Sequence, residues 1–244
     1  MKKPKILVYD IETSPNIAYT WGKYDQTVIE FIKEVEILCF AYKWHDEPGK
    51  VQWVSREGDR DDADLCKILK GLWDKADIVV AHNGDMFDNK IAKARMLHHG
   101  LKPPKILCSV DTKKVAKTYF MFNGNGLDDL GRYLKLGRKT KLPLGFETWL
   151  GCLRDDSKCW KQMVDYNCQD VELLDRVFTK LVPWIESYPN VHRLLNPDSK
   201  DIGVCPTCQS TSIQSRGVSA TKTAVRKRWS CNDCGKPFYT KWTK

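Results

Sequence analysis

The N-terminal stretch KILVYDIETSP, residues 5–15, constrains the fold more than any other part of the sequence. Its aliphatic run predicts a buried strand over residues 4–11 that leads into two carboxylates, Asp10 and Glu12. Side chains two positions apart lie on the same face of a strand, so both acids project together. Because neighbouring anions repel each other and lose solvation, the pattern favours a divalent cation between them. The alternative is a strand end in solvent, where any two acids are tolerated.

The remaining elements follow from apolar periodicity. It predicts further strands over 34–45, 50–55, 77–83 and 106–112, and helices over 60–76, 85–100, 125–137 and 156–187. The first strands form a meander with a turn at 46–50, and the later ones alternate with helices. This order predicts an α/β fold with a mixed sheet flanked by helices.

Charge and cysteines divide the chain into two parts. The net charge is +9, and residues 203–244 contribute eight basic side chains and one acid, which gives +7 for this tail and +2 for the rest. A cationic tail favours a polyanionic partner. Six of the ten cysteines are isolated, which is typical of buried small side chains, and four form two close pairs near the C-terminus.

The sequence contains no pattern of membrane insertion or export. No segment approaches the roughly 20 apolar residues that span a bilayer, and the N-terminus reaches charge too soon for a signal peptide. We therefore expect a cytoplasmic protein without a membrane partner.

Two further segments carry acids next to predicted elements. In DYNCQDVELL, residues 165–174, helical spacing places Tyr166 and Asp170 at the margin of an apolar face and Asp165 away from it. In AHNGDMFDNK, residues 81–90, Asn83 and Asp88 follow the carboxyl end of a strand, where α/β proteins place ligand sites. Simpler readings are a packed tyrosine with an aspartate on a solvated edge, and a capping box at a helix start.

Taken in order, these three segments resemble a known family. Asp10-x-Glu12, Asn83-x-x-x-Phe87-Asp88 and Tyr166-x-x-x-Asp170 are similar to the three motifs of the DEDD superfamily of 3′–5′ exonucleases. Tyrosine four residues before the last aspartate resembles the DEDDy branch, which includes the proofreading domains of family A and B DNA polymerases. The DEDDh branch would need histidine where Asp165 stands. The resemblance covers residues 1 to about 190, including VDT at 110–112 and GLDDLGRYLKLGRKTK at 126–141, and it implies a ribonuclease H-like fold with a five-stranded sheet.

The resemblance also implies a two-metal site for Mg²⁺ or Mn²⁺, which prefer carboxylate oxygens and water. Asp10, Glu12 and Asp170 would hold the first ion, and Asp10 would bridge to the second. Asp88 would act on the second ion through water, and Tyr166 would orient the attacking water. Carried over in the same way, the Thr13 backbone and Asn83 would lie near the terminal nucleotide, and Phe87 near its base or sugar.

A basic run begins in the helix predicted over 125–137 and continues past its end. It consists of Arg132, Lys135, Arg138, Lys139 and Lys141, which stand just before LPLG, residues 142–145. Such a run is often a solvated helix face. In the layout of the family it would lie near the substrate strand, which favours contacts with phosphates.

The two cysteine pairs, CPTC at 205–208 and CNDC at 231–234, are separated by 22 residues. This spacing predicts one structural Zn²⁺ held by Cys205, Cys208, Cys231 and Cys234; metal-free thiols are the alternative. The segment resembles transposase-type zinc ribbons, which are small three-stranded units. So short a module needs the metal for folding, and Trp229, Phe238, Tyr239 and Trp242 would form its small core.

The basic residues of the tail favour nucleic-acid binding, with Arg226, Lys227 and Arg228 as contact residues, and docking to a protein is the alternative. We therefore expect an exonuclease domain over 1–190, a linker over 191–202 and a basic zinc ribbon over 203–244.

The expected activity is stepwise removal of 5′-mononucleotides from single-stranded DNA or 3′ ends. The chain would act without a polymerase domain of its own, with a replication protein as a further partner, in the manner of a phage or mobile-element product inside the host cytoplasm. Alternatives are an exoribonuclease of the same superfamily, a nucleic-acid-binding module without turnover, and cleavage within a strand.

Overall fold

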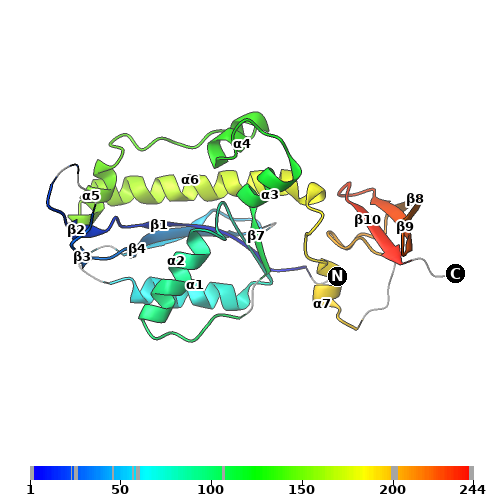
Figure 1. Cartoon of the computed structure of the whole chain (residues 1–244), viewed down its shortest axis with the longest axis horizontal. Helices are drawn as coiled ribbons and strands as arrows, with labels where there is room; N and C mark the ends of the chain where they lie inside the picture. The colour runs from blue at the N-terminus through cyan, green and yellow to red at the C-terminus, as the bar shows by residue number, and fades with distance from the viewer. Residues whose placement is uncertain are drawn as a thin grey trace.

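The computed structural model describes residues 3–22, 24, 27–45, 47–56, 58, 61–105, 108–198 and 203–241. A five-stranded mixed sheet forms the centre of the larger part of the chain (Figure 1). Its strands are β1 (Ile6–Thr13), β4 (Ile37–Trp44), β5 (Gln52–Ser55), β6 (Ile78–Ala81) and β7 (Cys108–Asp111). They lie in the order β5-β4-β1-β6-β7, with β4 antiparallel to β1 and β5, and β6 parallel to β1 and β7. The expected meander and mixed sheet are confirmed.

Helices cover both faces of this sheet. Figure 1 shows α6 (Ser157–Leu181) along one face, with α1 (Ala63–Lys75) and α2 (Asp88–His98) on the other. Shorter helices connect these elements: α3 (Thr112–Tyr119), α4 (Leu127–Tyr133), α5 (Glu147–Leu153), the 3₁₀ turn η1 (Val182–Trp184) and α7 (Val191–Leu195). None of the helices in the described ranges has the length and apolar composition needed to cross a bilayer.

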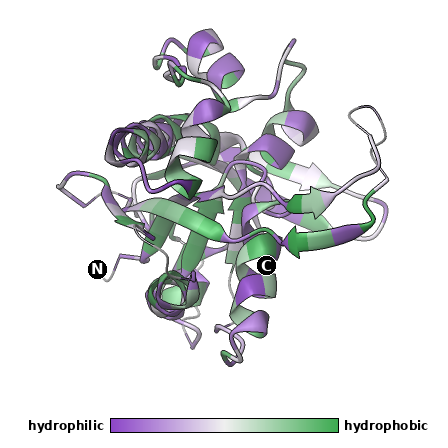
Figure 2. Cartoon of the chain, turned by 90° about the vertical axis from the view of Figure 1, so that its left-hand side faces the viewer, coloured by the Kyte–Doolittle hydropathy of each residue, from purple (hydrophilic) through white to green (hydrophobic). Residues whose placement is uncertain are grey.

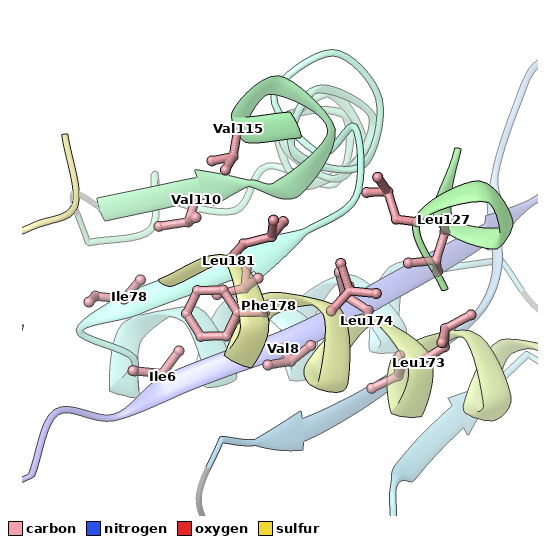
Figure 3. Packing of buried hydrophobic residues seen from close by; sticks show 14 of the residues in the cluster. Ile6, Val8, Ile78, Val110, Val115, Leu127, Leu173, Leu174, Phe178 and Leu181 are labelled. Atoms are coloured by element: carbon pink, nitrogen blue, oxygen red, sulfur yellow. The ribbon is translucent and has the colours of Figure 1, made fainter. Parts of the chain in front are cut away.

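The central strand β1 is buried on both faces. Ile6 and Val8 pack with Phe178 of α6 in one core (Figure 3), whereas Leu7 and Tyr9 belong to a second core beneath α1 and α2. A shift of β1 by one residue would exchange these two sets of side chains. The two cores therefore fix the register of β1 and the face on which its acids project.

Some elements were not predicted by periodicity. Strands β2 (Ile17–Tyr19) and β3 (Glu30–Lys33) pair as a hairpin that extends from the sheet, and Figure 2 shows the hydropathy of its residues. Its apolar side chains Ile17, Tyr19, Phe31 and Ile32 are exposed. Both strands are too short to show a reliable alternation. Helices α3 and α5 were missed for the same reason, because they span 8 and 7 residues.

Several sequence predictions reach beyond the described ranges, among them the helix predicted over 60–76, whose residue 60 lies outside them. The predicted 106–112 strand corresponds to β7, but residues 106 and 107 lie outside those ranges, as does residue 46 of the expected turn. The expected 191–202 linker begins with α7, whose Val191 is buried in the core, and its residues 199–202 are also outside.

The C-terminal module is a three-stranded antiparallel sheet in the order β10-β9-β8. It consists of β8 (Ile213–Ala220), β9 (Val225–Cys231) and β10 (Pro237–Lys241). Hydrogen bonds join the module to the larger part of the chain: Lys236 Nζ donates to the Ile185 carbonyl, and the Val191 amide donates to the Pro206 carbonyl at 2.7 Å. Of the expected core residues, Phe238 is buried and Trp229 packs beside it, Tyr239 is exposed, and Trp242 is outside the described residues.

A buried ion-pair network ties α1 to α2 and β4. The fully buried Asp62 carboxylate accepts hydrogen bonds from the Arg95 guanidinium at 2.9 and 2.7 Å and from the Ile37 amide at 2.8 Å. His99 Nε2 lies 2.6 Å from the same carboxylate. Burial alone would raise the pKa of Asp62, but these hydrogen bonds lower it by a larger amount. The resulting pKa is about 2.

Asp62→Asn should reduce the free energy of unfolding by about 3 kcal/mol at pH 7, because it removes the nearer counter-charge of the buried Arg95 and leaves the Glu36 carboxylate, 3.8 Å away. A carboxyl whose pKa is lowered in the folded state stabilises above its unfolded pKa, near 4, and loses that contribution as the pH falls through about 2. Urea unfolding at pH 7 and pH 3 measures both effects. An equal loss at the two pH values, or none at pH 7, would contradict the assignment.

Candidate active site and metal sites

Three carboxylates converge between β1 and α6. Oxygen atoms of Asp10, Glu12 and Asp170 all lie within 4.8 Å of one another. Asp10 and Glu12 project from the same face of β1, as their spacing predicts, and Asp170 comes from the helix that packs on that face. Asp170 was expected at the margin of the apolar face, but only 1% of it is exposed.

The fourth acid, Asp88, lies beside this cluster. It is the first residue of α2, and its Oδ1 accepts a hydrogen bond from the Ile11 amide at 3.1 Å. Asp88 is buried, and no side-chain hydrogen bond caps α2 at Phe87. The capping-box alternative therefore does not describe Asp88; its carboxylate is turned toward β1.

The electrostatics of these acids fit a bound cation. Burial, together with repulsion from Asp88, Glu12 and Asp170, raises the pKa of Asp10 well above its usual range. Burial, together with repulsion from Asp170 and Asp88, raises the pKa of Glu12 to about 8. Burial raises the pKa of Asp88 to about 6. Oδ1 of Asp170 is buried without a hydrogen-bond partner among the described residues. Hard oxygen donors that repel one another are suited to Mg²⁺ or Mn²⁺.

Lys139 supplies a positive charge to the same place. Its ammonium lies 2.5 Å from Asp170 Oδ2 and 4.9 Å from the centre of the Tyr166 ring. Although burial lowers the pKa of Lys139, the Asp170 carboxylate outweighs it, so the pKa is raised. Tyr166 is half-buried one turn before Asp170, and burial raises its pKa, whereas Asp165 is exposed as expected.

The loop after α4 holds Lys139 in position. The Lys139 amide donates to Asp128 Oδ1 at 2.9 Å, and the Leu136 amide donates to the Gly131 carbonyl at 2.8 Å. A Cβ at Gly131 would lie 2.8 Å from the Gly137 carbonyl oxygen, so glycine permits this close approach. Residues 138–141 are not helical. The helix-face alternative describes Arg132, which is exposed on α4, but not Arg138 and Lys141, which are exposed beyond the end of that helix.

The turn between β6 and α2 positions the middle motif. Asn83 has φ 70°, and its amide donates to Asp111 Oδ1 at 2.9 Å. The Asp85 amide donates to the other oxygen of Asp111 at 3.2 Å. Asp111 also caps α3, so it anchors two elements at the edge of the sheet. Sequence reasoning noted the VDT segment but gave this aspartate no role.

The structure places the two other expected substrate contacts at this end of the sheet. Phe87 is 40% exposed just before Asp88. Thr13 is half-buried at the end of β1, where the pairing with β4 shifts register. In the sequence, Phe87 directly precedes Asp88 and Thr13 directly follows Glu12.

Asn167 is a positioning residue that sequence reasoning missed. It is fully buried, and its side-chain amide donates to Asp10 Oδ2 at 2.7 Å and to the Asp10 carbonyl at 3.3 Å. The signal was present, because Asn167 is a polar residue inside the apolar face of α6, between Met163 and Val171. Such a residue needs a buried polar partner.

Asn167→Ala should lower metal-dependent activity by roughly 10- to 100-fold, the usual cost of losing a group that orients a metal ligand. Because Asn167 acts through Asp10, the apparent affinity for Mn²⁺ should fall with it. A Mn²⁺ titration of the hydrolysis rate measures both. The comparison variant is Asn167→Gln, which keeps the amide group on a longer side chain. An undiminished Mn²⁺ affinity in Asn167→Ala would refute the positioning role of Asn167.

Four cysteines meet in the C-terminal module. Ligand atoms of Cys205, Cys208, Cys231 and Cys234 all lie within 4.8 Å of one another. The sulfur atoms of Cys205 and Cys234 are 3.7 Å apart, and those of Cys208 and Cys231 are 3.5 Å apart. Tetrahedral Zn–S bonds of about 2.3 Å require sulfur separations of roughly 3.8 Å. The cluster therefore fits Zn²⁺.

The basic residues of β9 lie on two faces of the small sheet. Arg226 and Arg228 are exposed on one face, and Lys227, between them, is half-buried on the other. Tyr239 of β10 pairs directly with Arg228, so its ring lies on the arginine face. The three basic residues therefore do not form a single contact surface.

Comparison with known proteins adds to this geometry. The family model of the RNase H superfamily matches residues 7–182, which include every element that carries an acid of the site. The chain belongs to the RNase H superfamily. The expected ribonuclease H-like fold is thereby confirmed.

A solved structure shares the fold of this RNase H superfamily member. It is the family B DNA polymerase from the hyperthermophilic archaeon Pyrobaculum calidifontis, with 17% sequence identity and a TM-score of 0.52. The similarity covers 75% of this chain and 25% of the polymerase chain, so the protein spans only about a quarter of that polymerase. A sequence search of curated proteins found no match.

Proposed function

We propose that the protein is a metal-dependent 3′–5′ exonuclease of the DEDDy type that degrades DNA, at single strands or 3′ ends, to 5′-mononucleotides. The observation that carries the proposal is the buried cluster of Asp10, Glu12 and Asp170, whose oxygen atoms lie within 4.8 Å of one another. Membership in the RNase H superfamily and the polymerase neighbour support nuclease activity in general.

Each acid has a role in this proposal. Asp10, Glu12 and Asp170 would hold one Mg²⁺ or Mn²⁺, and Asp10 with Asp88 would serve a second, Asp88 through water. When bound, these ions would supply water activation and stabilisation of the leaving oxygen. The half-buried Tyr166 hydroxyl would orient the attacking water. Attack at phosphorus breaks the bond to the 3′ oxygen, which takes up a proton as the 5′-mononucleotide leaves.

The terminal nucleotide would be held from two sides. The Thr13 backbone, Asn83 and Phe87 would contact its sugar and base at the end of the sheet. Lys139 would exchange its partner Asp170 for a substrate phosphate, with Arg138 and Lys141 contacting phosphates further along the strand.

The C-terminal module would be a basic zinc ribbon over 203–244, following an exonuclease domain over 1–190 and a linker over 191–202. Its four cysteines would hold one structural Zn²⁺ and leave no open position for catalysis. The exposed Arg226 and Arg228 would contact nucleic acid, and Lys227 would support them from the opposite face. A replication protein is the other partner for this module.

The test is incubation with a 5′-labelled single-stranded DNA oligonucleotide and Mg²⁺, Mn²⁺ or neither, beside Asp10→Ala and a matched RNA. A metal-dependent ladder that shortens from the 3′ end, absent in the variant, is expected. Faster loss of the RNA would make the protein an exoribonuclease. An intact oligonucleotide that is bound in a native gel would refute catalysis and leave a nucleic-acid-binding module.

A further inference from the structure

A row of aromatic side chains runs from α4 to the end of α6. Tyr133 meets Phe122 edge to face, with ring centres 5.0 Å apart, and Phe122 stacks on Phe120 at 5.0 Å. Phe120 meets Trp184 of η1 edge to face at 5.8 Å. We call Tyr133, Phe122, Phe120 and Trp184 the aromatic row. Phe120 and Phe122 are half-buried against the core, so they support the outer two rings.

The two ends of the aromatic row are open to solvent. Tyr133 is 68% exposed and Trp184 is 64% exposed. Aromatic rings that serve only the core are mostly covered, whereas these rings present a free face or edge. Exposed rings on a fixed support can stack on the bases of a flexible strand.

Beyond Trp184, the row reaches a cleft between η1 and the C-terminal module. This cleft, here called the ribbon cleft, has a volume of about 1000 Å³, and its lining includes Trp184, Tyr188, Glu186, Arg226, Lys236 and Tyr239. Trp184 faces it from the larger part of the chain, and Tyr239, which is 58% exposed, faces it from β10. The two rings thus come from segments far apart in sequence.

The charge of the ribbon cleft suits phosphates. Arg226 lines it, and Arg228 is exposed on the same face of the small sheet, next to Tyr239. Glu186 and Cys234 are the acidic groups in the lining, and both face the buried Lys236, where their negative charges counteract the lowering of its pKa by burial. The Lys236 ammonium also donates to the Ile185 carbonyl. The exposed arginines therefore remain available to an anionic ligand.

The other end of the row is linked along the chain to the acidic cluster. Tyr133 is the last residue of α4, and the segment that follows carries Lys139 to Asp170. Figure 1 shows α3 and α4 beside α6, with the C-terminal module beyond the end of that helix. From Asp170 to Leu181, α6 rises about 16 Å at 1.5 Å per residue. A strand of several nucleotides would cover this distance.

We propose that the aromatic row and the ribbon cleft bind single-stranded DNA upstream of the nucleotide that is hydrolysed. The 3′ end lies at Asp10 and Glu12, and the 5′ part of the strand passes Tyr133 and Trp184 and enters the cleft. Its bases stack on the exposed rings, and Arg226 contacts its phosphates. This assignment rests on the proposed exonuclease function for the position of the 3′ end.

The test measures binding and hydrolysis separately. Fluorescence anisotropy of labelled oligothymidylates of 4 and 16 nucleotides is recorded without Mg²⁺ or Mn²⁺ and without chelator, so that zinc is retained. Trp184→Ala and Tyr239→Ala should each weaken binding of the 16-mer about tenfold, as expected for one lost base stack. Binding of the 4-mer should not change. Trp53→Ala, on the exposed edge strand β5, is the matched control and should bind like the unaltered protein.

The outcomes separate this proposal from the exonuclease function. With Mn²⁺ added, both variants should hydrolyse the 4-mer at the unaltered rate and the 16-mer more slowly at limiting concentration. Unchanged binding of the 16-mer by both variants, or equal weakening for the two lengths, would overturn the proposal even if hydrolysis persists. Length-dependent weakening without any hydrolysis would support the binding path and refute the exonuclease. Equal or tighter binding of a 16-nucleotide oligouridylate would overturn the assignment to DNA.

Discussion

Asp10→Asn should abolish metal-dependent hydrolysis and, at the same time, raise the melting temperature of the metal-free protein. The loss of activity should be at least about thousandfold, because Asp10 would serve both ions and their stabilisation of the transition state is worth several kcal/mol. The gain in stability follows from the raised pKa of Asp10, which burial and the neighbouring acids cause. Asparagine removes that repulsion, and its side-chain oxygen still accepts the hydrogen bond from Asn167.

The gain in melting temperature caused by Asp10→Asn should increase as the pH rises. A carboxyl whose pKa is raised in the folded state contributes full stability below its unfolded pKa, near 4, and loses it as the pH rises through the folded pKa. Glu12, with a pKa of about 8, extends this range to neutral pH and above. The difference between Asp10→Asn and the unaltered protein should therefore be small at pH 5 and larger at pH 8, roughly 2–4 °C for each kcal/mol relieved.

The matched control is Asp165→Asn on the exposed side of α6, which should change neither activity nor melting temperature. Calorimetry of metal-free protein and the oligonucleotide assay measure the two effects. Inactivity combined with a lower melting temperature would indicate general damage to the fold and would contradict the repulsion described here.

Cys231→Ser should remove the bound zinc and unfold the C-terminal module while the larger part of the chain stays folded. Structural Zn²⁺ supplies on the order of 10 kcal/mol of apparent folding free energy in small modules. The core of this module, formed by Phe238 with Trp229 and Ile213 against the cysteines, is too small to replace that contribution. One zinc per chain is expected in the unaltered protein and none in the variant.

Limited proteolysis tests the same prediction by showing which part of the chain is unfolded in Cys231→Ser. Cleavage in the variant should concentrate within residues 203–241, because the two cores of the larger part of the chain include no residue of the module and should stay folded. Cys168→Ser, half-buried on α6, is the control and should retain the zinc. A zinc-free variant that resists proteolysis as well as the unaltered protein would show that the metal is not needed for folding.

Local patterns predicted most of the sheet and the acids that cluster on it. The alternation of β1 placed Asp10 and Glu12 on one face, and the helical spacing of α6 placed Tyr166 and Asp170 one turn apart. These relations depend only on strand and helix geometry. The cysteine spacing predicted the four-sulfur cluster for a similar reason, since each pair forms one tight turn.

What local patterns did not predict depends on contacts between distant segments. The ion pair of Lys139 with Asp170 requires a loop whose course is set by Asp128 and Gly131, and the hydrogen bond of Asn167 to Asp10 joins residues 157 positions apart. Arg226, Lys227 and Arg228 were grouped by sequence, but strand geometry separates them. In each case the partner, and not the residue type, decides the role.

The distance along the chain between the two halves of the acidic cluster has a consequence for protein synthesis. Asp10 and Glu12 leave the ribosome early, whereas Asp170 lies in the middle of α6, which is the last long helix in the larger part of the chain. Until that helix docks, the cluster lacks one of its three carboxylates, and β1 lacks the cover of Phe178 and its neighbours. A nascent chain would therefore carry no complete cluster of the three carboxylates until α6 has left the exit tunnel and docked on the sheet.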